Sequence, residues 1–199
     1  MVTRGPHMTN VGSRWMRLDL PVWVTFAILL GIGTALIGAV EARTITQADP
    51  QGSLRVAYPA GWIATPGSPH LLDVQDPMSG AAVATRLIVT REAIGSGRTL
   101  SEIASETVLA RAQQLAMYRV LTQRDLRIGG RDALAIDYAF VGDPHETVLA
   151  AQRLPAVIRG TEVIVLADRV AYTIDVRAAA SIFDRERSTI DRILRGIRL

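Results

Sequence analysis

An uncharged stretch of 21 residues near the N-terminus constrains this chain more than any other feature. Residues 20–40 contain no Asp, Glu, Lys or Arg. At 1.5 Å per residue, a helix of this length spans about 30 Å, which is the thickness of the hydrocarbon core of a bilayer. Pro21 falls in the first turn, where a helix loses no hydrogen bond to proline. The stretch therefore predicts a transmembrane helix over residues 20–40.

The residues that flank this helix predict its orientation. Arg14 and Arg17 lie close to its N-terminal end, and Trp15 and Trp23 bracket the same edge, as aromatic side chains do at a membrane interface. By the positive-inside rule, residues 1–19 are cytoplasmic and residues 41–199 are extracytoplasmic. We expect a single-pass protein of the cell membrane whose membrane-interface residues are Arg14, Trp15, Arg17 and Trp23.

A cleaved signal peptide is the alternative interpretation. Val40 and Ala42 are small residues at the −3 and −1 positions of a cut after Ala42. An apolar stretch of 21 residues is, however, longer than the 7–15 residues of a signal peptide's apolar region. We therefore favour an uncleaved signal-anchor, and either interpretation exports the residues that follow.

Small residues recur at every fourth position of the predicted membrane helix, at Ala27, Gly31, Ala35 and Ala39. This spacing allows another helix to approach closely, which makes the four residues a candidate helix-docking stripe. The alternative is that Gly and Ala are simply common in membrane helices.

Composition limits the partners of the exported part. All 22 basic residues are Arg, and the formal charge is +3. Residues 1–20 carry three Arg and one Asp, a charge of +2, which leaves +1 for the remainder. A nearly neutral exported region argues against a nucleic acid partner. The absence of Cys excludes disulfides and thiolate metal sites.

The order of predicted elements indicates the fold class. Residues 41–53 are polar and contain Pro50 and Gly52, so they predict a linker before a domain over residues 54–199. Thr99 and Glu102 have the spacing of a helix capping box, and Gly129-Gly130 suits a two-residue hairpin turn. Strands are expected at 54–58, 62–65, 70–74, 82–90, 118–128, 132–141, 161–167 and 170–176, with helices from Thr99 to about Met117 and from Ser181 to about Ile197. This order favours an α+β fold, an antiparallel sheet flanked by helices.

Several motifs together resemble PsbP-like domains. Tyr58-Pro59-Ala60-Gly61-Trp62 is similar to the opening motif of that family, and residues 126–133 are similar to its central hairpin. Residues 171–174 resemble its penultimate strand, and residues 183–197 its closing helix. The resemblance covers about residues 54–199. It implies an α/β/α sandwich that serves as a docking or accessory module without catalysis, although this chain has a predicted membrane helix where many relatives have a lipobox Cys or a transit peptide.

Residues capable of catalysis are sparse. The chain has neither a Gly-x-Ser-x-Gly nucleophile motif nor a phosphate-binding loop with a terminal Lys, and we predict no catalytic or cofactor-binding residues. The strongest alternative is a Zn²⁺ or Mn²⁺ site, because His70 is followed by Asp73 and Asp76, and His145 lies beside Asp143. The competing interpretation is that both groups belong to turns.

Three functions are therefore weighed. The first is a non-catalytic accessory protein that docks on a larger membrane complex or on itself. The second is an extracytoplasmic carrier of a lipid or small apolar ligand, held between sheet and helix. The third is a metal-dependent exported hydrolase. Tyr58, Trp62 and Tyr138 are assigned to the core and not to a site.

Overall fold

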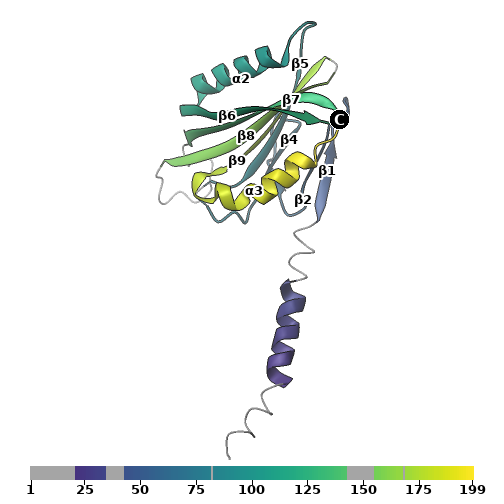
Figure 1. The fold of residues 1–199 in the computed structure, drawn as a ribbon, viewed down its shortest axis with the longest axis vertical. Helices are drawn as coiled ribbons and strands as arrows, with labels where there is room; N and C mark the ends of the chain where they lie inside the picture. The colour runs from purple at the N-terminus through teal and green to yellow at the C-terminus, as the bar shows by residue number, and fades with distance from the viewer. Residues whose placement is uncertain (1–20, 35–42, 82, 143–154, 168) are drawn as a thin grey trace, which may run out of the picture. The chain divides into compact units, whose positions relative to one another are not determined.

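The structure is a computed structural model that describes residues 21–34, 43–81, 83–142, 155–167 and 169–199 (Figure 1). It divides into two compact units, Met1–Arg43 and Thr44–Leu199.

The first unit contains a helix over residues 21–34. Its apolar side chains are exposed, and the rings of Trp23 and Phe26 meet edge to face. No helix among the described residues is both long and apolar enough to span a bilayer. The predicted span also includes residue 20 and residues 35–40, which lie outside the described part, so the transmembrane helix stays a prediction.

Half of the candidate docking stripe lies on this helix. Ala27 and Gly31 are both exposed, and no heavy atom comes within 4 Å of a Cβ built at Gly31. The other stripe and interface residues lie outside the described residues, namely Arg14, Trp15, Arg17, Ala35 and Ala39.

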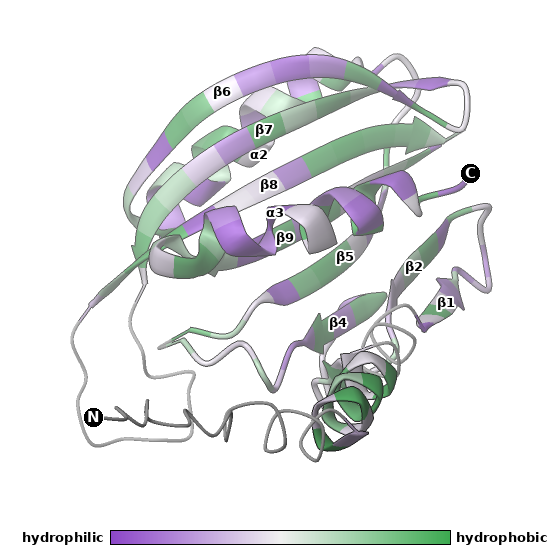
Figure 2. Ribbon diagram, turned by 60° about the horizontal axis from the view of Figure 1, so that its bottom comes forward, coloured by the Kyte–Doolittle hydropathy of each residue, from purple (hydrophilic) through white to green (hydrophobic). Residues whose placement is uncertain are grey.

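A seven-stranded antiparallel sheet forms the centre of the second unit, in the strand order β3-β4-β5-β9-β8-β7-β6. Its strands are β3 (Ile63–Ala64), β4 (Leu72–Gln75), β5 (Arg86–Ala93), β6 (Ala116–Ile128), β7 (Arg131–Gly142), β8 (Ala156–Ala167) and β9 (Val170–Ala179). Figure 2 shows that β8, in the interior of the sheet, is largely hydrophobic, whereas β6 at the edge alternates hydrophilic and hydrophobic segments. The sheet confirms the expected antiparallel arrangement.

Two hairpins of the sheet pair the strands that the sequence predicts to pair. Gly129 and Gly130 have φ values of +57° and +81°, as a two-residue hairpin turn requires, and they join β6 to β7. Ala167 of β8 pairs with Val170 of β9, which confirms the hairpin expected between these strands.

Helix α2 (Leu100–Gln114) begins as its capping box predicts. The Thr99 hydroxyl accepts a hydrogen bond from the Glu102 N–H, and the Glu102 carboxylate accepts one from the Thr99 N–H. The helix ends three residues before the expected Met117, because residues from Ala116 onward pair with β7.

Helix α3 (Ala180–Arg195) differs from expectation at its start. The prediction that Ser181 opens the helix is wrong, because Ala179 is the N-cap residue and no side chain caps the helix. The predicted apolar face is nevertheless present, since Ile182, Phe183, Ile190 and Ile193 are buried.

The sheet lies between the two helices, with α2 against one face and α3 against the other (Figure 1). On β7, Leu134 and Ile136 pack with α2, whereas Ala133 and Ala135 belong to the core beneath α3. Along this strand Ala133, Ala135 and Ala139 alternate with larger apolar residues, a pattern that predicts one buried face, but the structure buries both. The layers are those of an α/β/α sandwich.

The predicted linker over residues 41–53 is corrected by the structure. Residues Thr44–Ala48 form β1, which pairs antiparallel with β2 (Arg55–Pro59) in a separate two-stranded sheet. Asp49, directly after β1, is buried. The interpretation failed because Pro50 and Gly52, taken as signs of a linker, instead occupy the turn of a hairpin. The folded unit therefore begins ten residues earlier than residue 54.

Candidate functional site

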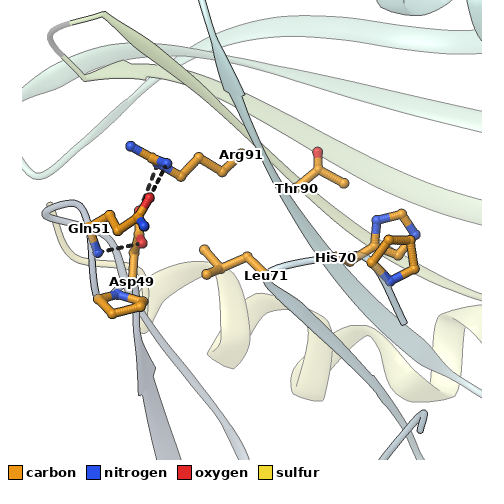
Figure 3. A pocket seen from close by; sticks show the side chains of 8 residues that line it. Asp49, Gln51, His70, Leu71, Thr90 and Arg91 are labelled. Carbon is orange, nitrogen blue, oxygen red and sulfur yellow. Dashed lines mark hydrogen bonds and ion pairs between the residues drawn. The ribbon is translucent and has the colours of Figure 1, made fainter. Parts of the chain in front are cut away.

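A cleft of about 400 Å³ opens beside His70, the residue that the sequence singles out (Figure 3). The loop after β1 lines one side of it with Asp49 and Gln51, and β5 lines another with Thr90 and Arg91. Figure 3 shows the hydrogen bonds of this cleft gathered at Asp49, Gln51 and Arg91, away from the His70 ring.

The charges of this cleft satisfy one another. The carboxylate of Asp49 accepts hydrogen bonds from the Tyr172 hydroxyl and the Gln51 N–H, at 2.7 and 2.9 Å, and lies 3.1 Å from Arg91 Nε. Arg91 also donates to the Gln51 side chain at 3.0 Å. Burial opposes ionisation of Asp49, but these partners outweigh it and lower its pKa. The arrangement fastens the β1–β2 hairpin to β5 and β9.

The carboxylates expected to join His70 at a metal face elsewhere. Asp73 forms a bidentate ion pair with Arg86, with both distances 2.7 Å, and accepts hydrogen bonds from Thr65 and Ser68. Asp76 accepts a hydrogen bond from the Met78 N–H within its own turn. Within the described ranges, no three His, Asp or Glu side chains gather as metal ligands.

The second predicted pair of metal ligands, Asp143 and His145, lies outside the described residues. That half of the metal hypothesis stays a prediction.

A more chemically distinctive cavity, of about 360 Å³, lies between α2 and the sheet. Ile103 and Ala110 of α2 and Ile94 of the preceding loop give it an apolar side. Arg111 of α2 and Glu162 of β8 give it an opposite pair of charges, joined by a hydrogen bond of 2.8 Å from Arg111 Nη2 to Glu162 Oε1. The cavity therefore combines apolar wall with a buried ion pair.

Glu162 is fully buried and only half satisfied. Its Oε2 atom has no hydrogen-bond partner, and its neighbour across the strands is Asp175 of β9, which is also buried. Burial raises the pKa of Glu162, and the Asp175 carboxylate adds to the rise, against the opposing effect of Arg111 and Arg177. A buried carboxylate with an unpaired oxygen is rare in folded proteins and calls for an explanation.

Tyr138 and Tyr118 lie next to Glu162 and Asp175 and complete a buried polar cluster. The Tyr138 hydroxyl donates a hydrogen bond to Asp175, and the Tyr138 ring lies across Gly160, where a Cβ would come within 2.5 Å of it. The Tyr118 ring packs on Tyr138 with the centroids 5.5 Å apart. Burial raises the pKa of Tyr118 to about 12, and Glu162 contributes to the rise. Burial also raises the pKa of Tyr138, so both hydroxyl groups stay protonated at physiological pH.

Sequence reasoning missed this cluster, although it assigned the aromatic residues correctly. Tyr58, Trp62 and Tyr138 are all buried, as predicted for core residues. The overlooked signal was a single acid in each of two apolar strands, Glu162 in one and Asp175 in the other. The hairpin predicted between these strands already places the two acids opposite each other.

Solved structures resemble this chain in fold. The cyanobacterial PsbP protein CyanoP from Synechocystis sp. PCC 6803 superposes with a TM-score of 0.59 at 18% identity, over 79% of this chain and 93% of that chain. The domain has a PsbP-like fold. LpqN of Mycobacterium tuberculosis, described as involved in cell envelope biogenesis, superposes on the PsbP-like chain with a TM-score of 0.53 at 8% identity, over 78% of this chain and 88% of its own.

A protein of unknown function from Pseudomonas aeruginosa has the same PsbP-like fold, with a TM-score of 0.51 at 12% identity, over 77% of this chain and 95% of its own. Neither a protein-family model nor a curated protein matches the sequence. At these identities the likeness establishes the fold of the domain, and function has to be argued from its own residues.

Proposed function

We propose that this protein is a non-catalytic accessory protein, anchored in the cell membrane by residues 20–40, whose PsbP-like domain lies on the extracytoplasmic side. There it docks on a larger membrane complex or on a second copy of itself. The observation that carries the proposal is the PsbP-like fold of the domain next to an uncharged stretch of membrane-spanning length.

The described side chains support a non-catalytic role. Asp73 binds Arg86, and Asp76 accepts a hydrogen bond within its own turn. Neither carboxylate therefore joins His70 as a metal ligand. The cavity beneath α2 contains a charged pair, which disfavours the hydrocarbon chain of a lipid. The hydrolase and the lipid carrier therefore have less support than the docking protein.

Association is tested with the full-length protein extracted from its own membrane in mild detergent and analysed by native mass spectrometry. We expect protein subunits, or a second copy, to remain bound. Gly31→Leu fills the stripe and reduces this association, whereas Ile32→Leu, on the next position of the same helix, leaves it unchanged. Docking is refuted if the native protein is always recovered alone.

Membrane topology is tested separately, using the absence of Cys from the chain. Ser96→Cys introduces a thiol in an exposed loop of the domain, and Ser13→Cys introduces one before the uncharged stretch. In intact cells, a membrane-impermeant maleimide is expected to label the first variant and not the second. The reverse pattern would place the domain in the cytoplasm.

A further inference from the structure

The cavity beneath α2 contains two unused hydrogen-bonding groups of opposite charge. Arg111 contacts Glu162 through Nη2, so the rest of its guanidinium still has N–H groups to donate. Glu162 uses only Oε1, and Oε2 has no partner. Both residues line the same cavity of about 360 Å³. A ligand that satisfies both must offer an acceptor and a donor close together.

Burial makes this pair more than a surface ion pair. The Glu162 side chain is 0% exposed and the Arg111 side chain 27% exposed, so Arg111 connects the buried acid to the opening of the cavity. An unpaired oxygen of a buried carboxylate is destabilising, and an incoming N–H donor would relieve this cost. The cavity therefore contains a basic and an acidic group in fixed positions before any ligand binds.

The remaining lining selects the body of the ligand. Ile94, Ile103 and Ala110 supply apolar surface opposite the charged pair. Arg98 at the cavity is ion-paired with Glu106 and is also influenced by the charge of Glu92, so the lining offers no uncompensated positive charge that would favour a strongly anionic ligand. The cavity fits a small, net-neutral molecule with a charged end and an aliphatic end.

We propose that this cavity binds a free α-amino acid with an aliphatic side chain. The ligand carboxylate accepts hydrogen bonds from the free N–H groups of Arg111, the ligand ammonium donates to Glu162 Oε2, and the aliphatic side chain packs on Ile94 and Ile103. This site is independent of the proposed docking function.

L-Leucine is the probe for this site, and two analogues each lack one of its charges. 4-Methylpentanoate lacks the ammonium group, and isopentylamine lacks the carboxylate. Isothermal titration calorimetry of the full-length protein in mild detergent is expected to show saturable binding of L-leucine and at least about tenfold weaker binding of either analogue, because each analogue loses a charge-assisted hydrogen bond. Equal binding of L-leucine and 4-methylpentanoate would reduce the site to an anion site on Arg111 and overturn the proposal.

Two variants locate the binding within the molecule. Glu162→Gln keeps the side-chain shape but removes the carboxylate, and Ala110→Trp fills the cavity from the exposed side of α2. Each is expected to weaken L-leucine binding at least about tenfold, whereas Arg124→Gln on β6, outside the cavity, leaves it unchanged. If Glu162→Gln fails to fold, as judged by circular dichroism, Ala110→Trp decides alone. The proposal is wrong if the wild-type protein gives no saturable heat with L-leucine at millimolar concentration, or if binding survives in the folded variants.

Discussion

The Tyr172 hydroxyl of β9 donates a hydrogen bond of 2.7 Å to the carboxylate of Asp49, 123 residues earlier in the chain. Both residues are buried, and the bond joins the β1–β2 hairpin to the central sheet. The hairpin is otherwise held by packing of Leu54 and Val56 in the core beneath α3 and by hydrogen bonds between Arg55 and Arg198. Asp49 thus adds a buried side-chain anchor to this packing and to these backbone hydrogen bonds.

Removal of this hydroxyl tests the anchor. Tyr172→Phe is expected to lower the free energy of unfolding by about 1–3 kcal/mol, because it withdraws a donor from a buried carboxylate. Tyr58→Phe is the matched control, because no hydrogen bond of the Tyr58 hydroxyl is present among the described residues, and it should change stability by less than about 0.5 kcal/mol. Urea denaturation followed by circular dichroism measures both. Equal effects of the two substitutions would show that the hydrogen bond contributes nothing.

The hairpin turn between β6 and β7 gives a second test. Gly130 has a φ of +81° with open space around its Cα, so Gly130→Ala meets backbone strain and no clash. We expect a loss of stability of about 1–2 kcal/mol. Gly61→Ala also enters open space, but without a positive φ, and should be neutral or slightly stabilising. Thermal unfolding of the two variants compares them directly, and a neutral Gly130→Ala would contradict the turn geometry.

The lowered pKa of Asp73 predicts how the stability of the domain changes in acid. Burial opposes its ionisation, but hydrogen bonds from Arg86 and Ser68 hold its pKa below the ordinary 3.8. Its carboxylate therefore stabilises the fold above about pH 3.8, and this contribution is lost as the pH falls toward the lower pKa of the folded state. Asp73→Asn should reduce stability at pH 7 while making unfolding less sensitive to pH between 4 and 2. Acid titration followed by circular dichroism detects the difference, and parallel curves would contradict the prediction.

Glu162 is expected to make the stability of the fold depend on pH in the opposite direction. Burial and Asp175 raise its pKa above the ordinary 4.5, so the neutral carboxyl is the form that the fold prefers. The contribution of Glu162 to stability is fully present below pH 4.5 and falls as the pH rises toward the raised pKa. Glu162→Gln removes this loss, so its stability relative to the wild type should be higher at pH 8 than at pH 4. Urea denaturation at the two pH values measures the change, and a constant difference would exclude it.

Local features of the structure were predictable because their physical cause lies within a few residues. The capping box of Thr99 and Glu102 and the Gly129-Gly130 turn each depend on neighbours in sequence, and both are confirmed. The alternation of β7 predicted a strand correctly but could not show that small Ala133 and Ala135 also face a packed layer. That layer comes from α3, more than 40 residues later in the chain.

The candidate sites depended on distant contacts, which is why the sequence did not predict them. Arg111 and Glu162 are 51 residues apart, so the sequence shows the acid in an apolar strand but not the arginine that pairs with it. The linker interpretation failed for a similar reason. Asp49 holds the first hairpin through Tyr172 and Arg91, which are both distant from it in sequence. His70 drew attention through its residue type, yet the carboxylates near it in sequence bind Arg86 or close a turn.

The Tyr138 ring across Gly160 makes these two positions interdependent in evolution. A side chain at residue 160 can be accommodated only if residue 138 becomes small, and that change also removes the hydroxyl that binds Asp175. Among homologous sequences, the aromatic residue, the glycine and the acid should therefore be inherited or lost together. A natural chain with Ala at position 160 and Tyr at position 138 would need a different path for β7 or β8.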